Sequence, residues 1–105
     1  MSDPRVNPTD YENECIRSAS DEGHLKVVER LLLDPRVDPS DLDNWAIRAA
    51  SWNGHLEVVE RLLQDPRVDP SANDNDALKL ALKNNHTKVI ERLLLDYRVV
   101  VLTLN

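Results

Sequence analysis

Asp34-Pro35-Arg36-Val37 decides the fold, because this stretch returns at a fixed interval of 31 residues. Two further copies and a fourth, changed one have the same spacing: Asp3-Pro4-Arg5-Val6, Asp65-Pro66-Arg67-Val68 and Asp96-Tyr97-Arg98-Val99. Three consecutive segments align without gaps, with 13 of 31 columns identical: 3–33, 34–64 and 65–95. A repeat of this length predicts a stacked array whose units cannot bury their apolar faces alone.

Length and charge limit the number of domains and the class of partner. The 105 residues suffice for one domain, so we expect a single repeat domain over 1–105, with 96–105 as a partial fourth unit or tail. Thirteen basic residues against 19 acidic ones give a net charge of -6. Nucleic-acid binding relies on clusters of Lys and Arg, so this charge disfavours a nucleic acid and favours a basic or neutral protein partner.

Cysteine content and apolar runs bear on the compartment. Cys15 is alone, which excludes an intramolecular disulfide, and the start of the chain lacks the apolar core of a secretory signal. The longest apolar stretch, around 99–104, is far short of the roughly 20 residues of a membrane helix. We therefore expect an intracellular, cytoplasmic protein without a membrane segment.

Each unit contains two apolar-periodic stretches separated by a polar step. In the second unit these are 45–52 and 55–64, joined by Asn53-Gly54, which predicts two short antiparallel helices. We expect the first helix to begin after Asn44, with the asparagine side chain as its cap; Asn13 and Asn75 share this column. It should end at Gly54, whose column holds Gly23 and Asn85, because these residue types most readily adopt the left-handed conformation.

The second helix carries an apolar stripe that we expect to form the core. Its residues recur at i, i+3 and i+4 in all three units: Val27, Val28, Leu31, Leu32; Val58, Val59, Leu62, Leu63; Val89, Ile90, Leu93, Leu94. Pro35 and Pro66 should stop this helix, with Asp34 and Asp65 near its end. The connector over 34–44 should be an extended finger with turns and, at most, brief strand pairing.

The second unit resembles an ankyrin repeat. The resemblance rests on residues 46–59, Ala-Ile-Arg-Ala-Ala-Ser-Trp-Asn-Gly-His-Leu-Glu-Val-Val, followed by the leucine pair Leu62-Leu63. It recurs in register over 3–95 and implies an all-α helical solenoid of three helix-loop-helix units with finger connectors. The period is 31 instead of the usual 33, so the fingers should be shorter. The family's Thr-Pro-Leu-His opening is replaced by Trp45-Ala46-Ile47-Arg48, and the terminal units lack distinct polar caps.

The sequence offers no arrangement suited to catalysis, a cofactor or a metal. The three histidines, His24, His55 and His86, occupy one column of successive units. Packed helices lie about 8–10 Å apart, whereas zinc needs nitrogens at about 2.0–2.1 Å. We expect each histidine to make local hydrogen bonds at the start of a second helix, and Cys15, aligned with Ala46 and Ala77, to fill a small packing site.

Columns that differ between units are the candidate partner-binding positions. The ankyrin resemblance implies that partners contact finger tips and first helices, which here are Asp10, Tyr11, Asp21, Glu22, Asp41, Leu42, Trp52, Asn53, Ala72, Asn73, Lys83 and Asn84. Trp52 is the best anchor, because tryptophan is enriched among residues that dominate interfaces. Trp45 lies seven residues earlier on the same helical face. Alternatively, either ring packs flat over neighbouring helices with only its edge wet, a reading we favour for Trp45 and leave open for Trp52.

A second hypothesis is self-association through the tail. Five apolar residues there lack an intervening proline: Val99, Val100, Val101, Leu102 and Leu104. Such a segment can fold back over the last unit as a cap, or pair with the same segment of another chain.

Overall fold

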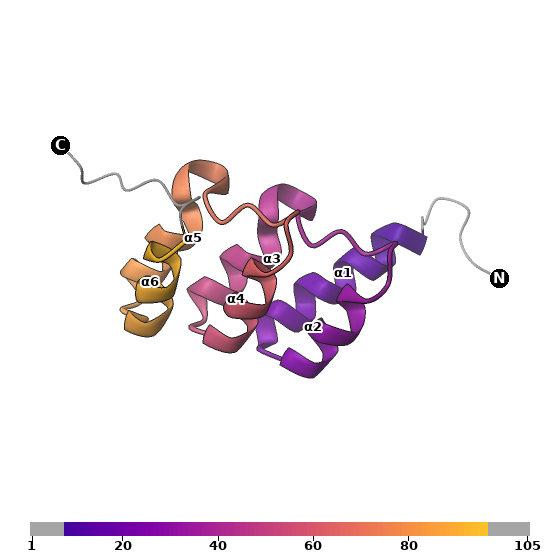
Figure 1. Cartoon of the computed structure of the whole chain (residues 1–105), viewed down its shortest axis with the longest axis horizontal. Coiled ribbons are helices and arrows are strands. Elements are labelled where there is room, and N and C mark those ends of the chain that lie inside the picture. The colour runs from indigo at the N-terminus through magenta and orange to yellow at the C-terminus, as the bar shows by residue number, and fades with distance from the viewer. Residues whose placement is uncertain (1–7, 97–105) are drawn as a thin grey trace.

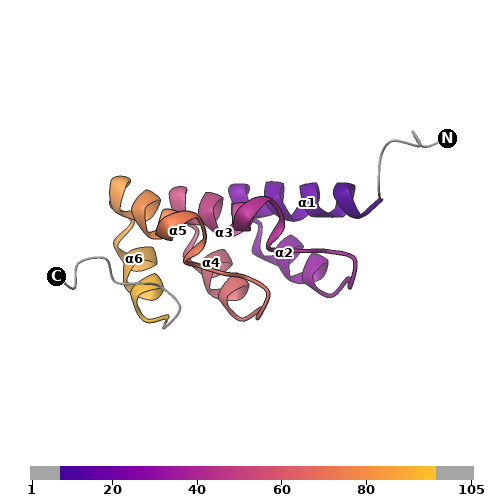
Figure 2. The same ribbon diagram turned by 90° about the horizontal axis from the view of Figure 1, so that it is seen from above.

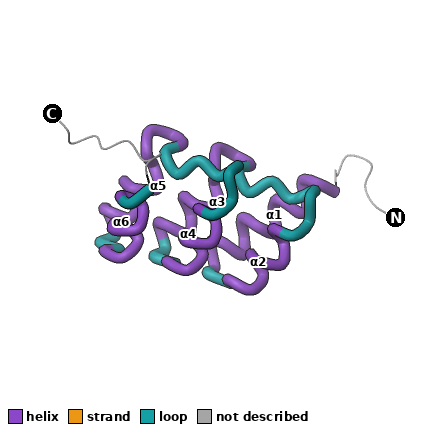
Figure 3. The backbone as a smooth tube through the Cα atoms, in the orientation of Figure 1, coloured by secondary structure: helices purple, strands orange, loops and turns teal. Residues whose placement is uncertain are grey.

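The computed structural model describes residues 8–96, with side chains from Tyr11 onward. Its helices are α1 (Pro8–Glu22), α2 (Leu25–Leu32), α3 (Asp41–Trp52), α4 (Leu56–Leu63), α5 (Ala72–Lys83) and α6 (Thr87–Leu94). They form two rows, α1, α3 and α5 in one and α2, α4 and α6 in the other (Figures 1 and 2). Residues 8–96 contain no strand (Figure 3). The predicted all-α solenoid is confirmed.

The turn between the two helices of each unit has the predicted left-handed residue. Gly23, Gly54 and Asn85 have φ angles of 76°, 73° and 58°. In the middle unit the backbone N–H of His55 then donates to the carbonyl of Ala50 at 2.9 Å, which closes the end of α3. The second helix therefore begins directly after the turn and runs antiparallel to the first.

The predicted apolar core holds fully in the middle unit and fails at the two ends of the array. Val58 is 1% exposed and Leu63 6%. Their counterparts Val27 and Leu94 are 48% and 47% exposed, so the expectation that these two belong to the core is wrong. Each lies on the side of its unit that no other described unit covers, because burial of a repeat side chain depends on the neighbouring unit.

The repeated Asp-Pro-Arg-Val stretch forms a compact turn after each second helix. The carboxylate of Asp34 accepts from the backbone N–H of Arg36 at 2.9 Å and from its Nε and Nη2 at 3.1 and 2.8 Å. These hydrogen bonds lower the pKa of Asp34 to about 2. Arg67 holds Asp65 in the same way and lowers its pKa. Val37 is fully buried and anchors the connector to the core.

Asn13 and Asn44 do not cap the first helices of their units, contrary to our expectation. Asn44 lies in a left-handed turn, where Leu42, Asp43 and Asn44 have φ angles of 55°, 55° and 61°. Its Oδ1 accepts from the backbone N–H of Asp69 in the next connector at 2.8 Å. Asn13, within α1, makes the same contact to Asp38 at 2.7 Å. The regular right-handed part of α3 still starts after Asn44, but the asparagine ties one unit to the next.

Arg48 stabilises this left-handed turn from one helical turn further on. Its Nη2 donates to the carbonyl of Leu42 at 2.9 Å and its Nε donates to that of Asp43 at 3.0 Å. Left-handed conformations cost L-residues roughly 1–2 kcal/mol each, so the turn depends on such support. In the second unit, Arg48 thus takes over part of the role of the family opening that the sequence lacks.

Two of the segments discussed from the sequence lie outside residues 8–96. The apolar tail Val99, Val100, Val101, Leu102 and Leu104 lies outside the described residues, as does the changed fourth motif after Asp96. Within residues 8–96, every helix is too short or too polar to cross a lipid bilayer.

Candidate partner-binding face

The first helices of all three units meet around a small groove. It has a volume of about 170 Å³ and is lined by Asp21, Trp45, Arg48, Ala49, Trp52 and Leu80, contributed by α1, α3 and α5. The two tryptophans line one groove, as expected from their spacing of seven residues. The groove therefore crosses both boundaries between units.

Trp52 is the exposed aromatic residue of this groove. It is 38% exposed, and the Nζ of Lys83 lies 5.6 Å from its ring centroid. This distance allows a cation–π contact between the ammonium and the indole ring. Trp45 is only partly exposed. Trp52 is thus the more exposed of the two indoles.

The backbone beneath Trp52 is held by the third unit. The carbonyl oxygen of Trp52 accepts from Nδ2 of Asn84 at 2.8 Å and lies 2.9 Å from Nε2 of His86. Because a carbonyl can only accept, Nε2 of His86 must carry a proton. Our expectation of local histidine hydrogen bonds is therefore wrong for His86, and also for His55, since each has a partner 34 residues away.

The same pair of contacts joins the first and second units. The Nδ2 of Asn53 lies 3.0 Å from the carbonyl oxygen of Asp21 and 2.7 Å from its Oδ1. The Nε2 of His55 lies 3.0 Å from that carbonyl oxygen. In the second and third units, the histidine and the asparagine two residues before it thus fix the C-terminal end of the preceding first helix. In the second unit this helix end carries Trp52, whose backbone is held in place.

Acidic side chains outnumber basic ones on the first helices and their connectors. The acidic residues are Glu12, Glu14, Asp21, Glu22, Asp38, Asp41, Asp43, Asp69, Asp74 and Asp76; the basic ones are Arg17, Arg48, Lys79 and Lys83. The three segments that carry the second helices, 24–37, 55–68 and 86–96, together contain seven acidic and seven basic residues. The negative net charge of the described residues is therefore located on the tryptophan side.

Two of those basic groups are engaged across unit boundaries. Arg17 forms an ion pair with Asp41, and Nη1 of Arg48 lies 3.2 Å from Oδ2 of Asp76. Asp43 and Asp74, in the left-handed turns of the connectors, are exposed. The field at the finger tips is consequently negative, and it would attract a cationic partner.

The remaining candidate partner-binding residues differ in exposure. Tyr11, Leu42 and Asn73 are exposed near the start of the first helices. Glu22 is exposed and lies 3.2 Å from Nε2 of His24, and Ala72 is half-buried. Asp10 belongs to α1, but its side chain lies outside the described part.

Sequence reasoning missed three residues that line the groove. These are Arg48, Ala49 and Leu80. The last two share a column that varies between units, with Ser18 as its third member, so that variation was the available signal. Arg48 gave none, because its column is basic in all three units.

The described residues were also expected to lack a metal site. Within 8–96, no group of three or more His, Cys, Asp or Glu side chains could hold a metal ion. His55 and His86 instead contact backbone carbonyls of the preceding unit at 3.0 and 2.9 Å. These two histidines therefore serve the packing between units.

A family model described as ankyrin repeats (3 copies) matches residues 15–103. No curated protein matches the sequence. The matched region includes both boundaries between units and the groove with Trp52.

Proposed function

The chain belongs to the ankyrin repeat family, whose members are generally protein-protein interaction modules, and we propose that it is a non-catalytic adapter or scaffold module. Its partner binds the first-helix face and finger tips, with Trp52 inserted at the centre. The observation that carries this proposal is an exposed tryptophan on a backbone fixed by Asn84 and His86. A rigid aromatic side chain contributes contact area at little cost in conformational entropy.

The charge distribution favours a partner segment that carries basic residues. Asp43 and Asp74 are exposed at neighbouring finger tips, while Arg17 and Arg48 are already paired with carboxylates. A basic segment across the fingers would therefore meet exposed carboxylates, while the charges of these two arginines are already balanced. Such complementarity raises association rates and weakens with added salt.

Affinity capture with matched variants tests the proposal. We expect Trp52→Ala to lower capture of a specific partner at least about tenfold, as hot-spot residues do, with helical content unchanged. Leu33→Ala is the control, because Leu33 is 80% exposed after α2, away from the first-helix row. Asp43→Lys with Asp74→Lys should weaken the same interaction, most strongly at low salt.

Two results would contradict this proposal. One is a purified partner that binds equally well to the chain and to Trp52→Ala. The other is binding that Leu33→Ala weakens and Trp52→Ala leaves unchanged, since that would locate the interface on the second-helix row.

A further inference from the structure

A column of serines marks where consecutive units touch, and it changes in the third unit. Ser20 and Ser51 are fully buried, and their hydroxyls have no hydrogen-bond partner among the described residues. The column therefore requires a small side chain rather than a polar one. The third unit has Leu82 in this column, 51% exposed at the C-terminal end.

The glycine column also changes in the third unit. A Cβ added to Gly54 would lie 2.5 Å from Nδ1 of His86, and one on Gly23 would lie 2.6 Å from Nδ1 of His55. Only glycine therefore lets the histidine of the next unit take its place. Asn85 occupies this column in the third unit and has a Cβ. A following unit could not place its histidine as His86 is placed.

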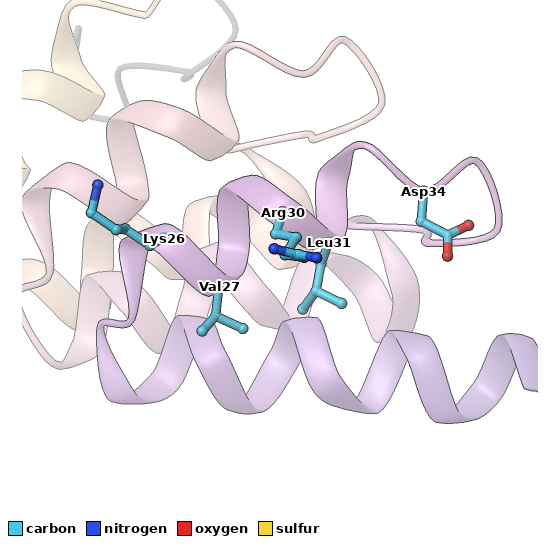
Figure 4. Close-up of a pocket in the computed structure, with 5 residues that line it drawn as sticks. All are labelled: Lys26, Val27, Arg30, Leu31 and Asp34. Carbon is cyan, nitrogen blue, oxygen red and sulfur yellow. The ribbon is translucent and has the colours of Figure 1, made fainter.

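The N-terminal end of the array has the opposite character. Val27 and Leu31 lie side by side on α2 and line a groove of about 470 Å³ with Lys26, Arg30 and Asp34 (Figure 4). Their counterparts Val58 and Leu62 are 1% and 0% exposed, because the preceding unit covers them. His24, the histidine of this unit, is exposed, and its Nε2 lies 3.2 Å from Oε1 of Glu22 in the same unit. At this end, the surface that the preceding unit covers inside the array is left exposed.

We propose that the array can be extended at its N-terminal end only, because Leu82 and Asn85 close its C-terminal end. The N-terminal face takes an ankyrin-type unit with serine and glycine in the columns of Ser51 and Gly54. A second copy of this chain cannot be that occupant, since its C-terminal end has the bulkier residues. The proposal does not depend on the partner-binding face, which is formed by other residues.

Insertion of one identical unit at three positions in the full chain tests this asymmetry. The insert is a second copy of residues 34–64, placed before Asp3, between Gln64 and Asp65, or between Leu95 and Asp96. The middle position is the positive control, because Ser51 and Gly54 precede it. The readouts are hydrogen exchange of the inserted helices and the urea dependence of unfolding, whose slope scales with the surface exposed.

We expect the inserted unit to dock at the first two positions and not at the third. A docked fourth unit should protect its own amides and raise the urea slope by about a third, since the folded array grows from three units to four. After Leu95, the inserted helices should exchange as rapidly as an isolated unit would. In the background Leu82→Ser with Asn85→Gly, the same insert should become protected.

The proposal fails on any of three results. One is equal protection of the insert after Leu95 with and without the two substitutions. Another is an insert before Asp3 that is not protected. The third is protection before Asp3 that Val27→Glu does not reduce. The double variant without an insert is the folding control: its circular dichroism should match that of the unchanged chain, because Leu82 is exposed and glycine suits the left-handed position.

Discussion

The middle unit and the outer units have nearly the same second helix, yet they differ in what covers it. Val27 and Val58 occupy one column, and so do Leu63 and Leu94, but the outer member of each pair is about half exposed. The difference arises because α4 has a neighbouring second helix on both sides, α2 and α6. Among the described residues, α2 and α6 each have such a neighbour on one side only. Stability in such an array is approximately a sum of weak units and the interfaces between them.

The largest expected difference between middle and outer units is for leucines of one column. Leu62→Ala should lower the free energy of unfolding by about 2–5 kcal/mol, because a fully buried leucine leaves a cavity. Leu31→Ala should cost less than half as much, since Leu31 is only partly buried at the open end. Urea unfolding of both variants measures the difference. Equal losses would mean that the missing neighbour does not matter.

Next in size is the effect of adding a Cβ in the glycine column. Gly54→Ala places an L-residue at φ 73°, which costs about 1–2 kcal/mol. It also displaces the ring of His86, a form of overpacking that typically costs about 1–3 kcal/mol. The opposite change, Asn85→Gly, should stabilise the chain by a few tenths to about 1 kcal/mol by relieving the same conformation. Thermal unfolding of both variants should show shifts of opposite sign.

A smaller effect is expected at the asparagines that join the units. Asn44→Ala removes the acceptor for the Asp69 N–H and should cost about 1–3 kcal/mol, because the Asn44 side of this hydrogen bond is buried. Asn73→Ala is the matched control, since Asn73 is exposed in a neighbouring turn. If hydrogen exchange of the Asp69 amide were the same in both variants, the contact would have no role in coupling units.

The smallest expected effect is an acid dependence of the connectors. The folded pKa of Asp34 is about 2, below its ordinary value of 3.8, so its stabilisation is complete above that ordinary value. It should be lost as pH falls from about 4 to about 2, because the proton then displaces Arg36. Asp34→Asn should remove this part of the acid sensitivity. An unchanged acid-unfolding profile would contradict the prediction.

Features local to one unit could be predicted from the sequence. Helix periodicity located the two helices, and Gly54 located the turn between them, because both depend on nearby backbone geometry. The tryptophan groove was predicted in part, since the spacing of Trp45 and Trp52 indicates a shared face. A single unit aligned with its copies was sufficient for these conclusions.

Features that join units could not be predicted from the same patterns. Asn44 has the residue type of a helix cap, and nothing in its own segment shows that its acceptor serves Asp69. His86 likewise follows a helix start, although its partner is the carbonyl of Trp52. The exposure of Val27 and Leu94 depends on the presence of a neighbour, which a conserved column cannot reveal.

The cross-unit contacts also have a consequence for the order of folding. They join residues between 24 and 34 positions apart, from Arg17 with Asp41 to His55 with Asp21. Closing a loop of this length has a modest entropic cost, and short-range topologies fold quickly. Two adjacent units can therefore form a nucleus before the third has ordered. Because α3 and α4 take part in either possible pair, we expect the chain to begin folding through its middle and to order its ends last.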